Sequence, residues 1–357
     1  MKKIFIAADD IDSSIVEGIS NFVKEGKIIA IPTETVYGLL VCAENQEAVD
    51  RLYTIKERPK DKPFTYVEDD IDTVINDYFI LLSPFGYRLI EKFWPGALTI
   101  VYYSKENSDK TIGVRIPSHP VAREIIRVLD KKAVLPSANI SGQIELNTPE
   151  EIEKVFDDKI DLIVESNSNL ISKMPSTVID LTYKPFKILR EGFIQEREII
   201  DVFIKKRILF VCTGNTCRSP MALFLFNKYL LEKKPYYKDR FEVLSCGILQ
   251  LKGAPISFTA GSVLKEEEGI DTSDFKSTFI NRRLLLSSDL IFVMEDSHIE
   301  AILKIEPSVE GRLFNLKKFL PHNLEKDIPD PIGKSYEFYK EVYFLIKKAI
   351  LELVEWL

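Results

Sequence analysis

Residues 207–220 read RILFVCTGNTCRSP, an apolar run followed at once by a short polar loop. The run 207–211 has the length and composition of a buried strand, and the apolar stretch Pro220–Leu231 predicts a helix. Gly214 allows the backbone conformation that a tight loop needs, and Pro220 suits the first helical turn. Strand, loop and helix in this order predict the start of an α/β domain.

The loop between this strand and this helix has the features of an anion cradle. Backbone N–H groups point inward there, and a helix N-terminus favours negative charge. Arg218 can return to the cradle and offer its planar guanidinium to phosphate oxygens. In such a field the thiol of Cys212 is expected to be a thiolate that attacks phosphorus, with Ser219 hydrogen-bonded to the sulfur. The other loop residues of this predicted site are Thr213, Gly214, Asn215, Thr216 and Cys217.

The same alternation continues to the end of the chain. Strands are predicted at Phe241–Leu244 and Leu290–Met294, and helices at Ile256–Glu268 and Ser335–Leu357. Strands that alternate with helices predict a doubly wound parallel sheet.

Residues 207–357 resemble the low-molecular-weight protein phosphatase family at this loop and at Asp330-Pro331. The resemblance implies that Asp330 is the general acid, which protonates the leaving group and then activates water. It also implies phosphoprotein substrates and no cofactor.

Two substrate classes remain open for this domain. The loop is most similar to that of the bacterial protein arginine phosphatases, and Thr216 replaces the larger aliphatic residue of tyrosine phosphatases. Ile332 stands where an aromatic residue is usual in both groups. Pocket chemistry favours phospho-arginine, with phospho-tyrosine as the alternative. Cys217 either forms a protective disulfide with Cys212 on oxidation or simply packs in the loop.

The first half of the chain has a mixed α/β pattern with dispersed motifs. Pro32-Thr33-Glu34-Thr35-Val36-Tyr37-Gly38-Leu39 follows a predicted strand and offers hydroxyls in a turn. Lys56 and Arg58 lie at a predicted helix end, and Ser137-Ala138-Asn139 follows another strand. Cations that converge with hydroxyl and amide groups suit a triphosphate, although each motif alone is equally typical of a helix end or a turn.

In this order and spacing, together with Trp94-Pro95-Gly96, these motifs resemble the threonylcarbamoyl-AMP synthase (YrdC-like) family. The resemblance covers about 15–193 and implies ATP, L-threonine and bicarbonate as substrates, with Mg²⁺. It implies tRNA and the proteins of tRNA threonylcarbamoylation as partners. The residues that it assigns to ATP are Lys56, Arg58, Lys62, Thr111, Ser137, Asn139 and Arg190, and those that it assigns to threonine are Thr35, Arg115 and Ser176.

The sequence departs from that family at Val67, where many members have histidine, and at Glu145-Leu146-Asn147, where Ser-Pro-Thr is usual. A second hypothesis therefore stays open. The first domain is either an active synthase, which makes the chain bifunctional, or a silent module that binds nucleotide or double-stranded RNA beside a tyrosine phosphatase.

Length and composition agree with two domains. The chain has 357 residues, 45% hydrophobic and 29% charged, with a net charge of −7. We expect domains at 1–195 and 207–357, joined by a partly helical linker at 196–206. Only four cysteines occur, and neither a membrane span, a secretory signal nor a set of metal ligands is recognisable, so we expect a cytoplasmic protein.

Overall fold

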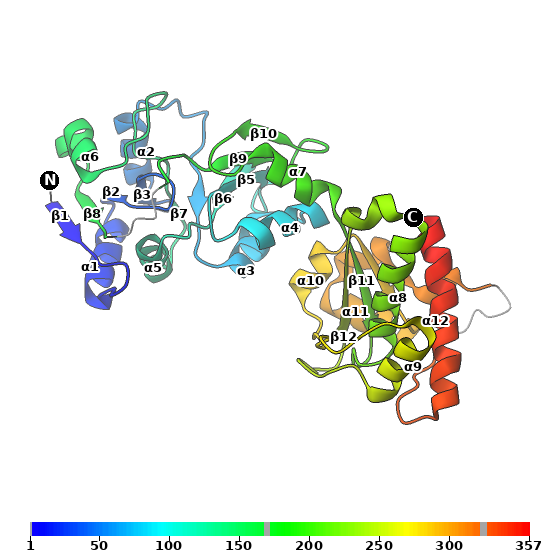
Figure 1. Ribbon diagram of the computed structural model, residues 1–357. Helices are drawn as coiled ribbons and strands as arrows, with labels where there is room; N and C mark the ends of the chain where they lie inside the picture. Colours follow the sequence, from blue (N-terminus) through cyan, green and yellow to red (C-terminus); the bar gives the residue numbers. More distant parts are fainter. Residues whose placement is uncertain (1, 168–171, 322–326) are drawn as a thin grey trace. The chain divides into compact units, whose positions relative to one another are not determined.

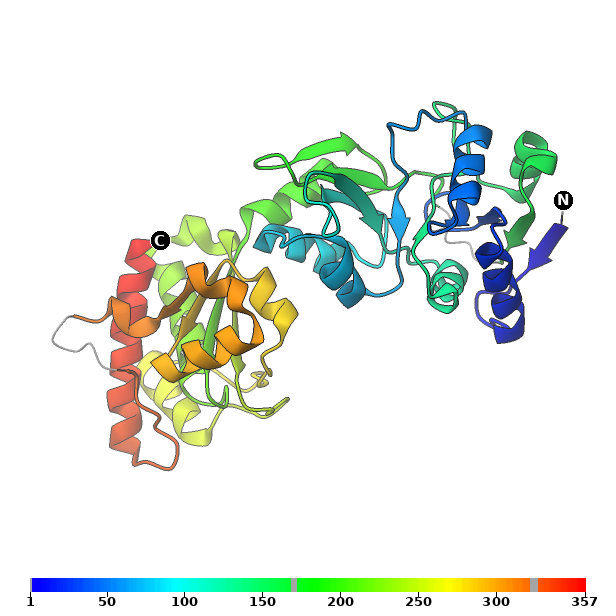
Figure 2. The same cartoon turned by 180° about the vertical axis from the view of Figure 1, so that it is seen from behind.

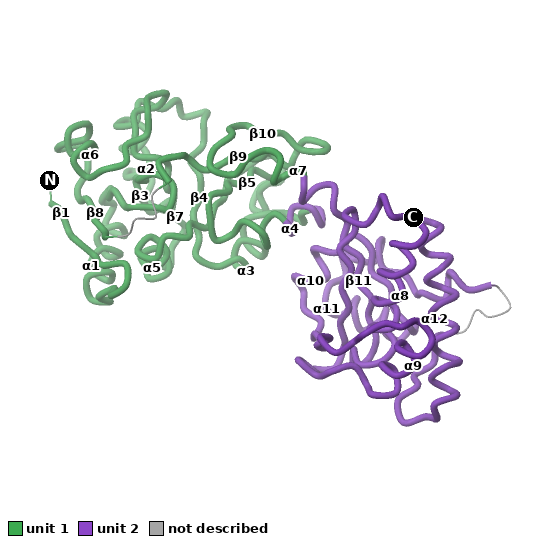
Figure 3. Tube along the Cα trace, viewed as in Figure 1, with its two compact units in different colours: residues 1–82, 89–200 green, residues 83–88, 201–357 purple. Residues whose placement is uncertain are grey.

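The computed structural model describes residues 2–167, 172–321 and 327–357. The chain forms two compact units, Met1–Leu82 with Leu89–Ile200 and Ser83–Arg88 with Asp201–Leu357 (Figure 3). Each unit has its own sheet and its own core. Within the described ranges, no helix combines the length and the apolar composition needed to cross a bilayer.

Unit 1 is built on a ten-stranded mixed sheet of order β1-β8-β2-β3-β7-β4-β6-β5-β9-β10. Strand β2, for example, pairs antiparallel with β3 and parallel with β8. The strands are β1 (Lys2–Phe5), β2 (Ile29–Ile31), β3 (Gly38–Cys42), β4 (Tyr66–Val67), β5 (Leu98–Tyr103), β6 (Thr111–Arg115), β7 (Ala133–Val134), β8 (Leu162–Glu165), β9 (Thr177–Asp180) and β10 (Lys187–Arg190).

Helices cover both faces of the central strands of unit 1 (Figure 1). Ile29 and Ile31 pack with α1 and α5, whereas Ile28 and Ala30 pack with α2 and α6. Burial on both faces explains why this strand is an unbroken apolar run. The helices are α1 (Ser13–Lys24), α2 (Gln46–Ile55), α3 (Ile71–Thr73), α4 (Pro84–Phe93), α5 (Pro120–Leu129), α6 (Pro149–Phe156) and α7 (Glu196–Ile204), and α4 and α7 are divided between the units.

Unit 2 is built on a parallel sheet of order β12-β11-β13-β14. Ile208 and Phe210 face α8, α9 and α12, whereas Leu209 and Val211 face the side that α10 and α11 cover, which lies in front in Figure 2. The elements are β11 (Lys206–Cys212), α8 (Arg218–Lys233), β12 (Phe241–Gly247), α9 (Phe258–Glu268), α10 (Arg282–Ser287), β13 (Leu290–Val293), α11 (Asp296–Ile305), β14 (Leu313–Asn315) and α12 (Tyr336–Trp356).

The predicted fold class is confirmed: a mixed α/β unit precedes a doubly wound parallel one. The Pro32–Leu39 motif was expected to form a turn, but its last two residues, Gly38 and Leu39, belong to strand β3. A Cβ on Gly38 would lie 2.7 Å from the Leu135 side chain, so glycine permits this close packing. Helix α1 and strand β1 had no counterpart among the predicted elements.

A buried carboxylate joins three helices of unit 2. The side chain of Glu268 in α9 is 3% exposed and accepts from Lys228 and Tyr229 of α8 and from Tyr343 and Lys347 of α12. Burial alone would raise the pKa of Glu268, but the hydrogen bonds from these lysines and tyrosines outweigh it and lower the pKa to about 2. The ionised carboxylate therefore stabilises the packing of α8, α9 and α12.

We expect Glu268→Gln to lower the free energy of unfolding of unit 2 by about 2–4 kcal/mol at pH 7, because it leaves two lysines without their buried counter-charge. The pKa is lower in the folded state, so the contribution is complete above about pH 4.5 and is lost as the pH falls towards 2. Hydrogen exchange of the amides of α8 and α12 in the full chain measures this change in the free energy of unfolding. Glu355→Gln, which breaks an exposed pair with Lys233, is the control and should change exchange little.

Candidate functional site: a cysteine phosphate loop and a cationic pocket

The phosphate loop of unit 2 lies at the carboxyl end of the central strand. Strand β11 ends at Cys212, and α8 begins at Arg218. Both side chains are nearly inaccessible, at 2% and 1% exposure. Asn215 has φ +54°, in the left-handed region that asparagine tolerates better than most residues, and this conformation closes the turn.

Hydrogen-bond donors surround the sulfur of Cys212. The backbone N–H of Asn215 donates to Sγ at 3.3 Å, and the Ser219 hydroxyl lies 3.0 Å from Sγ. The Asn215 amide donates to the oxygens of Ser219 and Ser245, at 2.9 Å each. The Ser219 oxygen accepts from Asn215, and its proton can go to the sulfur at 3.0 Å or, over a longer distance, to the Cys246 carbonyl at 3.4 Å. A bond to the sulfur would stabilise negative charge there.

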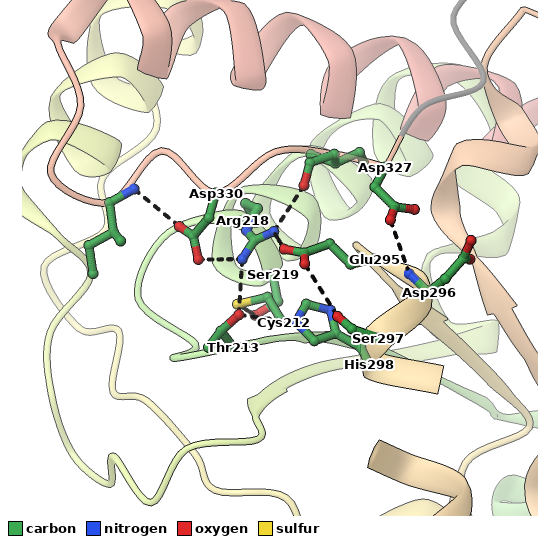
Figure 4. Close-up of polar contacts among 12 residues, drawn as sticks. Cys212, Thr213, Arg218, Ser219, Glu295, Asp296, Ser297, His298, Asp327 and Asp330 are labelled. Atoms are coloured by element: carbon green, nitrogen blue, oxygen red, sulfur yellow. Dashed lines mark hydrogen bonds and ion pairs between the residues drawn. The ribbon is translucent and has the colours of Figure 1, made fainter. Parts of the chain in front are cut away.

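The Arg218 guanidinium is held between two carboxylates, as Figure 4 shows. Nη1 contacts Glu295 and donates to the carbonyl of Ile328 at 2.9 Å. Nη2 contacts Asp330 at 2.5 Å and the Thr213 hydroxyl at 3.0 Å. The structure thus brings Cys212, Arg218 and Asp330 together, although Asp330 lies more than a hundred residues along the chain from the loop.

Two other loop residues hold the cradle in place. The Thr216 carbonyl accepts from the N–H of Ser257 at 2.8 Å. Cys217 Sγ lies 3.1 Å from the Ser257 hydroxyl, and Cys212 and Cys217 are both free thiols. Gly214 does not supply the left-handed conformation expected of it, because Asn215 does, and a Cβ on Gly214 would make only an ordinary 3.4 Å contact with the Leu251 side chain.

Sequence reasoning missed Glu295 and His298, which follow the carboxyl end of β13. His298 is 4% exposed, and its Nε2 lies 3.0 Å from the Thr213 hydroxyl. Burial lowers the pKa of His298, so the neutral ring is favoured. The sequence could have predicted both residues, because the run 295–298 follows the predicted strand Leu290–Met294. The carboxyl ends of parallel strands meet at one edge of a sheet, which is where the phosphate loop lies.

Unit 1 contains a pocket of about 440 Å³ that gathers most of the residues predicted for ATP and threonine. Its volume lies within the range of small-molecule sites. Thr35, Lys56 and Asn139 do not line it but contact residues that do. The predicted residues among its lining are Arg58, Lys62, Thr111, Arg115, Ser137, Ser176 and Arg190.

Lys56 is a buried lysine whose amine is satisfied by carbonyl oxygens. Its Nζ donates to the backbone oxygens of Ser137 and Asn139, at 2.6 Å each. Burial and the nearby charge of Arg58 lower the pKa of Lys56 to about 7. Arg58 donates to the carbonyl of Lys62 at 2.8 Å and stacks over Phe64. The strand-end motif at 137–139 and the helix-end cations therefore form one cluster.

Arg115 and Arg190 are oriented by neighbouring oxygens. Arg115 Nη2 contacts Glu34 and donates to the Thr35 hydroxyl at 2.8 Å. Glu34, which was not predicted as a site residue, also accepts from the backbone N–H of Ser118.

Arg190 donates to the backbone oxygen of Ser176 at 2.9 Å, and the Ser176 hydroxyl lies 2.9 Å from that of Thr99. Burial lowers the pKa of Arg190, which nevertheless stays cationic. The pocket therefore presents fixed guanidinium groups to an anion.

Comparison with known proteins assigns both halves of the chain. Residues 21–192 match the family model described as Telomere recombination, which groups Sua5, YciO and YrdC proteins. Threonylcarbamoyl-AMP synthase of Pyrococcus abyssi is 33% identical over 199 residues, 53% of this chain and 57% of that protein. Putative threonylcarbamoyl-AMP synthase of Methanocaldococcus jannaschii is 31% identical over 197 residues, 54% of this chain and 92% of that protein. This chain belongs to the threonylcarbamoyl-AMP synthase family.

The second half of this synthase-family chain is a low-molecular-weight phosphatase domain. Residues 207–357 match the family model described as Low molecular weight phosphotyrosine protein phosphatase. A solved double variant of Sua5 from P. abyssi aligns with 65% of this chain and 77% of its own, at 27% identity and a TM-score of 0.51. The chain spans little more than half of the curated P. abyssi relative. The predicted fusion of the two families is confirmed.

The close approach of β12 to the phosphate loop allows a direct test of the site. A Cβ on Gly247 would lie 2.8–3.0 Å from backbone atoms of Thr213, Gly214 and Asn215. We expect Gly247→Ala to distort the cradle, so that phosphate protects Cys212 from iodoacetate only at about tenfold higher concentration or more. Gly311→Ala, which meets no atom within 4 Å, is the matched control. Equal protection in both variants would contradict the assigned geometry.

Proposed function

We propose that this chain is a bifunctional enzyme, with a threonylcarbamoyl-AMP synthase in unit 1 and a cysteine-dependent protein phosphatase in unit 2. The observation that carries the phosphatase is the convergence of Cys212, Arg218 and Asp330 at one edge of the parallel sheet. The family assignment supports both activities. The four free cysteines agree with a cytoplasmic location.

The phosphatase reaction follows from the positions of these groups. Cys212 Sγ attacks phosphorus, an S–P bond forms, and the bond to the leaving oxygen or nitrogen breaks as Asp330 delivers a proton to that atom. Arg218 and the loop N–H groups bind the phosphoryl oxygens. Asp330 then removes a proton from water, which attacks phosphorus and releases Cys212 as a thiolate stabilised by Ser219.

The Arg218–Asp330 contact describes the site before substrate binds. Nη2 of Arg218 is held by the acid itself at 2.5 Å. An arriving phosphate dianion competes for the same donor, and it frees Asp330 to face the leaving group. Substrate binding thereby sets up the acid for the first step.

We infer that phospho-arginine is the preferred substrate. Thr216 is a half-buried residue of the loop that joins Cys212 to Arg218. A hydroxyl at this place can bond to a phosphoramidate N–H or to the attacking water, which a larger aliphatic side chain cannot do. Phospho-tyrosine proteins are the alternative substrates.

For unit 1, we propose that a threonine carbamate attacks the α-phosphorus of ATP and that pyrophosphate leaves, with threonylcarbamoyl-AMP as the product. Arg115 and Thr35 bind threonine. Lys56, Arg58 and Arg190 neutralise the triphosphate, so that catalysis rests on positioning and charge. The product serves the threonylcarbamoylation of tRNA adenosine.

Mg²⁺ is proposed to enter with the nucleotide. Among the residues that the structure describes, no group of three or more His, Cys, Asp and Glu side chains could hold a metal ion. Phosphate oxygens are the ligands that Mg²⁺ usually combines with a few carboxylates. In this pocket Asp61 and Asp180 are the carboxylates of the lining.

For the phosphatase, Cys212→Ser should abolish hydrolysis of an aryl phosphate, and Asp330→Asn should slow it by about 10²–10⁴. Cys42→Ser, a buried thiol of unit 1, should leave it unchanged. Phospho-arginine and phospho-tyrosine peptides are then compared by kcat/KM. A tyrosine reaction faster by about tenfold would reject the arginine preference.

For the synthase, pyrophosphate release from ATP should require both threonine and bicarbonate. Lys56→Ala and Arg58→Ala should each lower it by about tenfold or more. Arg58→Ala removes a charge from the lining of the pocket, and Lys56→Ala removes the donor that holds the Ser137 and Asn139 carbonyls beside it. Lys60→Ala is the control, since Lys60 is an exposed lysine paired with Asp50. Absence of release together with measurable RNA binding would instead favour a silent RNA-binding domain.

A further inference from the structure

A polar cluster stands behind the acid-bearing loop of unit 2. It consists of Asn315 at the end of β14, Lys317 in the following turn, Asp296 at the start of α11, and Asp327. We call these four residues the clasp. Figure 4 shows Asp327 beside Asp296, with the chain passing from Asp327 on to Asp330.

Asn315 and Lys317 each contact both carboxylates of the clasp. The Asn315 amide donates to Asp296 and to Asp327, at 2.8 Å each. Lys317 Nζ pairs with Asp296 and lies 3.1 Å from Asp327. The backbone N–H of Asp296 adds a bond to Asp327 at 3.4 Å. The segment before Asp330 is thereby tied to the segment that carries Glu295.

The clasp depends on Lys317, because this lysine is the cation that its two carboxylates share. The two carboxylates lie side by side and repel each other unless a cation lies between them. Hydrogen bonds from Lys317 and then Asn315 lower the pKa of Asp296, and the bond to Asp296 raises the pKa of Lys317. The ion pairs are partly exposed and individually weak, but Asn315 is 1% exposed and fixes their orientation.

A short and rigid path leads from the clasp to the acid. Ile328 follows Asp327, is fully buried, donates to the Met294 carbonyl at 3.0 Å and accepts from Arg218 at 2.9 Å. Pro329 and Pro331 flank Asp330 and restrict the backbone on both sides. A shift at Asp327 is therefore transmitted to the Asp330 carboxyl.

We propose that Asn315 and Lys317 are positioning residues for the general acid, and that the clasp sets the place of Asp330 over the leaving atom. This inference rests on the proposed phosphatase activity. Neither residue reaches the phosphate loop in the described contacts, so they act through Asp327 and Ile328.

The test is the leaving-group dependence of Lys317→Met in the full chain. General-acid catalysis matters most for a basic leaving group. We expect kcat/KM, which reports the step in which the S–P bond forms and the leaving group departs, to fall by about tenfold or more for phenyl phosphate and by less than about threefold for p-nitrophenyl phosphate. Asn315→Ala should show the same split, and Lys317→Arg should restore most of the phenyl phosphate rate.

Controls separate positioning from simple destabilisation. Lys233→Met breaks an exposed pair on the same domain and should leave both rates unchanged. In an Asp330→Asn background, Lys317→Met should add less than about twofold, because both changes act through one group. Equal losses on both substrates, or additive losses in the double variant, would overturn the proposal. A wild-type chain without turnover would instead overturn the phosphatase assignment itself.

Discussion

The buried guanidinium of Arg218 is the group around which the second domain's site is organised. At 1% exposure it needs charged and polar partners within the protein. Glu295 and Asp330 supply the charge, and the Ile328 carbonyl and the Thr213 hydroxyl complete the shell. These partners come from separate segments, so one buried charge brings together the ends of β11 and β13 and the loop before α12. Removing either carboxylate would leave part of that charge uncompensated.

In unit 1, basic side chains from separate segments are likewise held by oxygen atoms of the protein. Lys56 is satisfied by backbone carbonyls, Arg190 by the Ser176 oxygens, and Arg115 by Glu34 and Thr35. These contacts fix donors around a pocket of about 440 Å³ before any anion arrives. Fixed donors need little reorganisation, which is the property that electrostatic catalysis uses. Both units therefore hold hydrogen-bond donors in fixed positions. In unit 2 these donors surround the nucleophile Cys212, whereas in unit 1 they surround a pocket without a nucleophile.

Much of the fold could be predicted because the main strands and helices are strongly patterned. From Ile208 onwards, strand β11 is an unbroken apolar run, since Leu209 and Phe210 face opposite helical layers. A very short strand carries too little pattern: Tyr66–Val67 is a strand only because neighbouring strands pair with it. Helix α1 was missed although Asp12 caps it and Val16 and Val23 line its buried face, which is a readable signal.

The amino-acid sequence by itself determined the phosphate loop, because nearly all its parts lie within nine consecutive residues. The end of β11, the backbone N–H of Asn215, the Ser219 hydroxyl and the start of α8 surround Cys212 through local geometry. Only the tertiary structure decided that Glu295 and His298 complete the site. They lie about 80 residues beyond Cys212 and meet the loop because parallel strands end at one edge of the sheet. The hydrophobic periodicity of the sequence cannot predict these contacts, because it indicates which face of an element is buried and not which strands become neighbours.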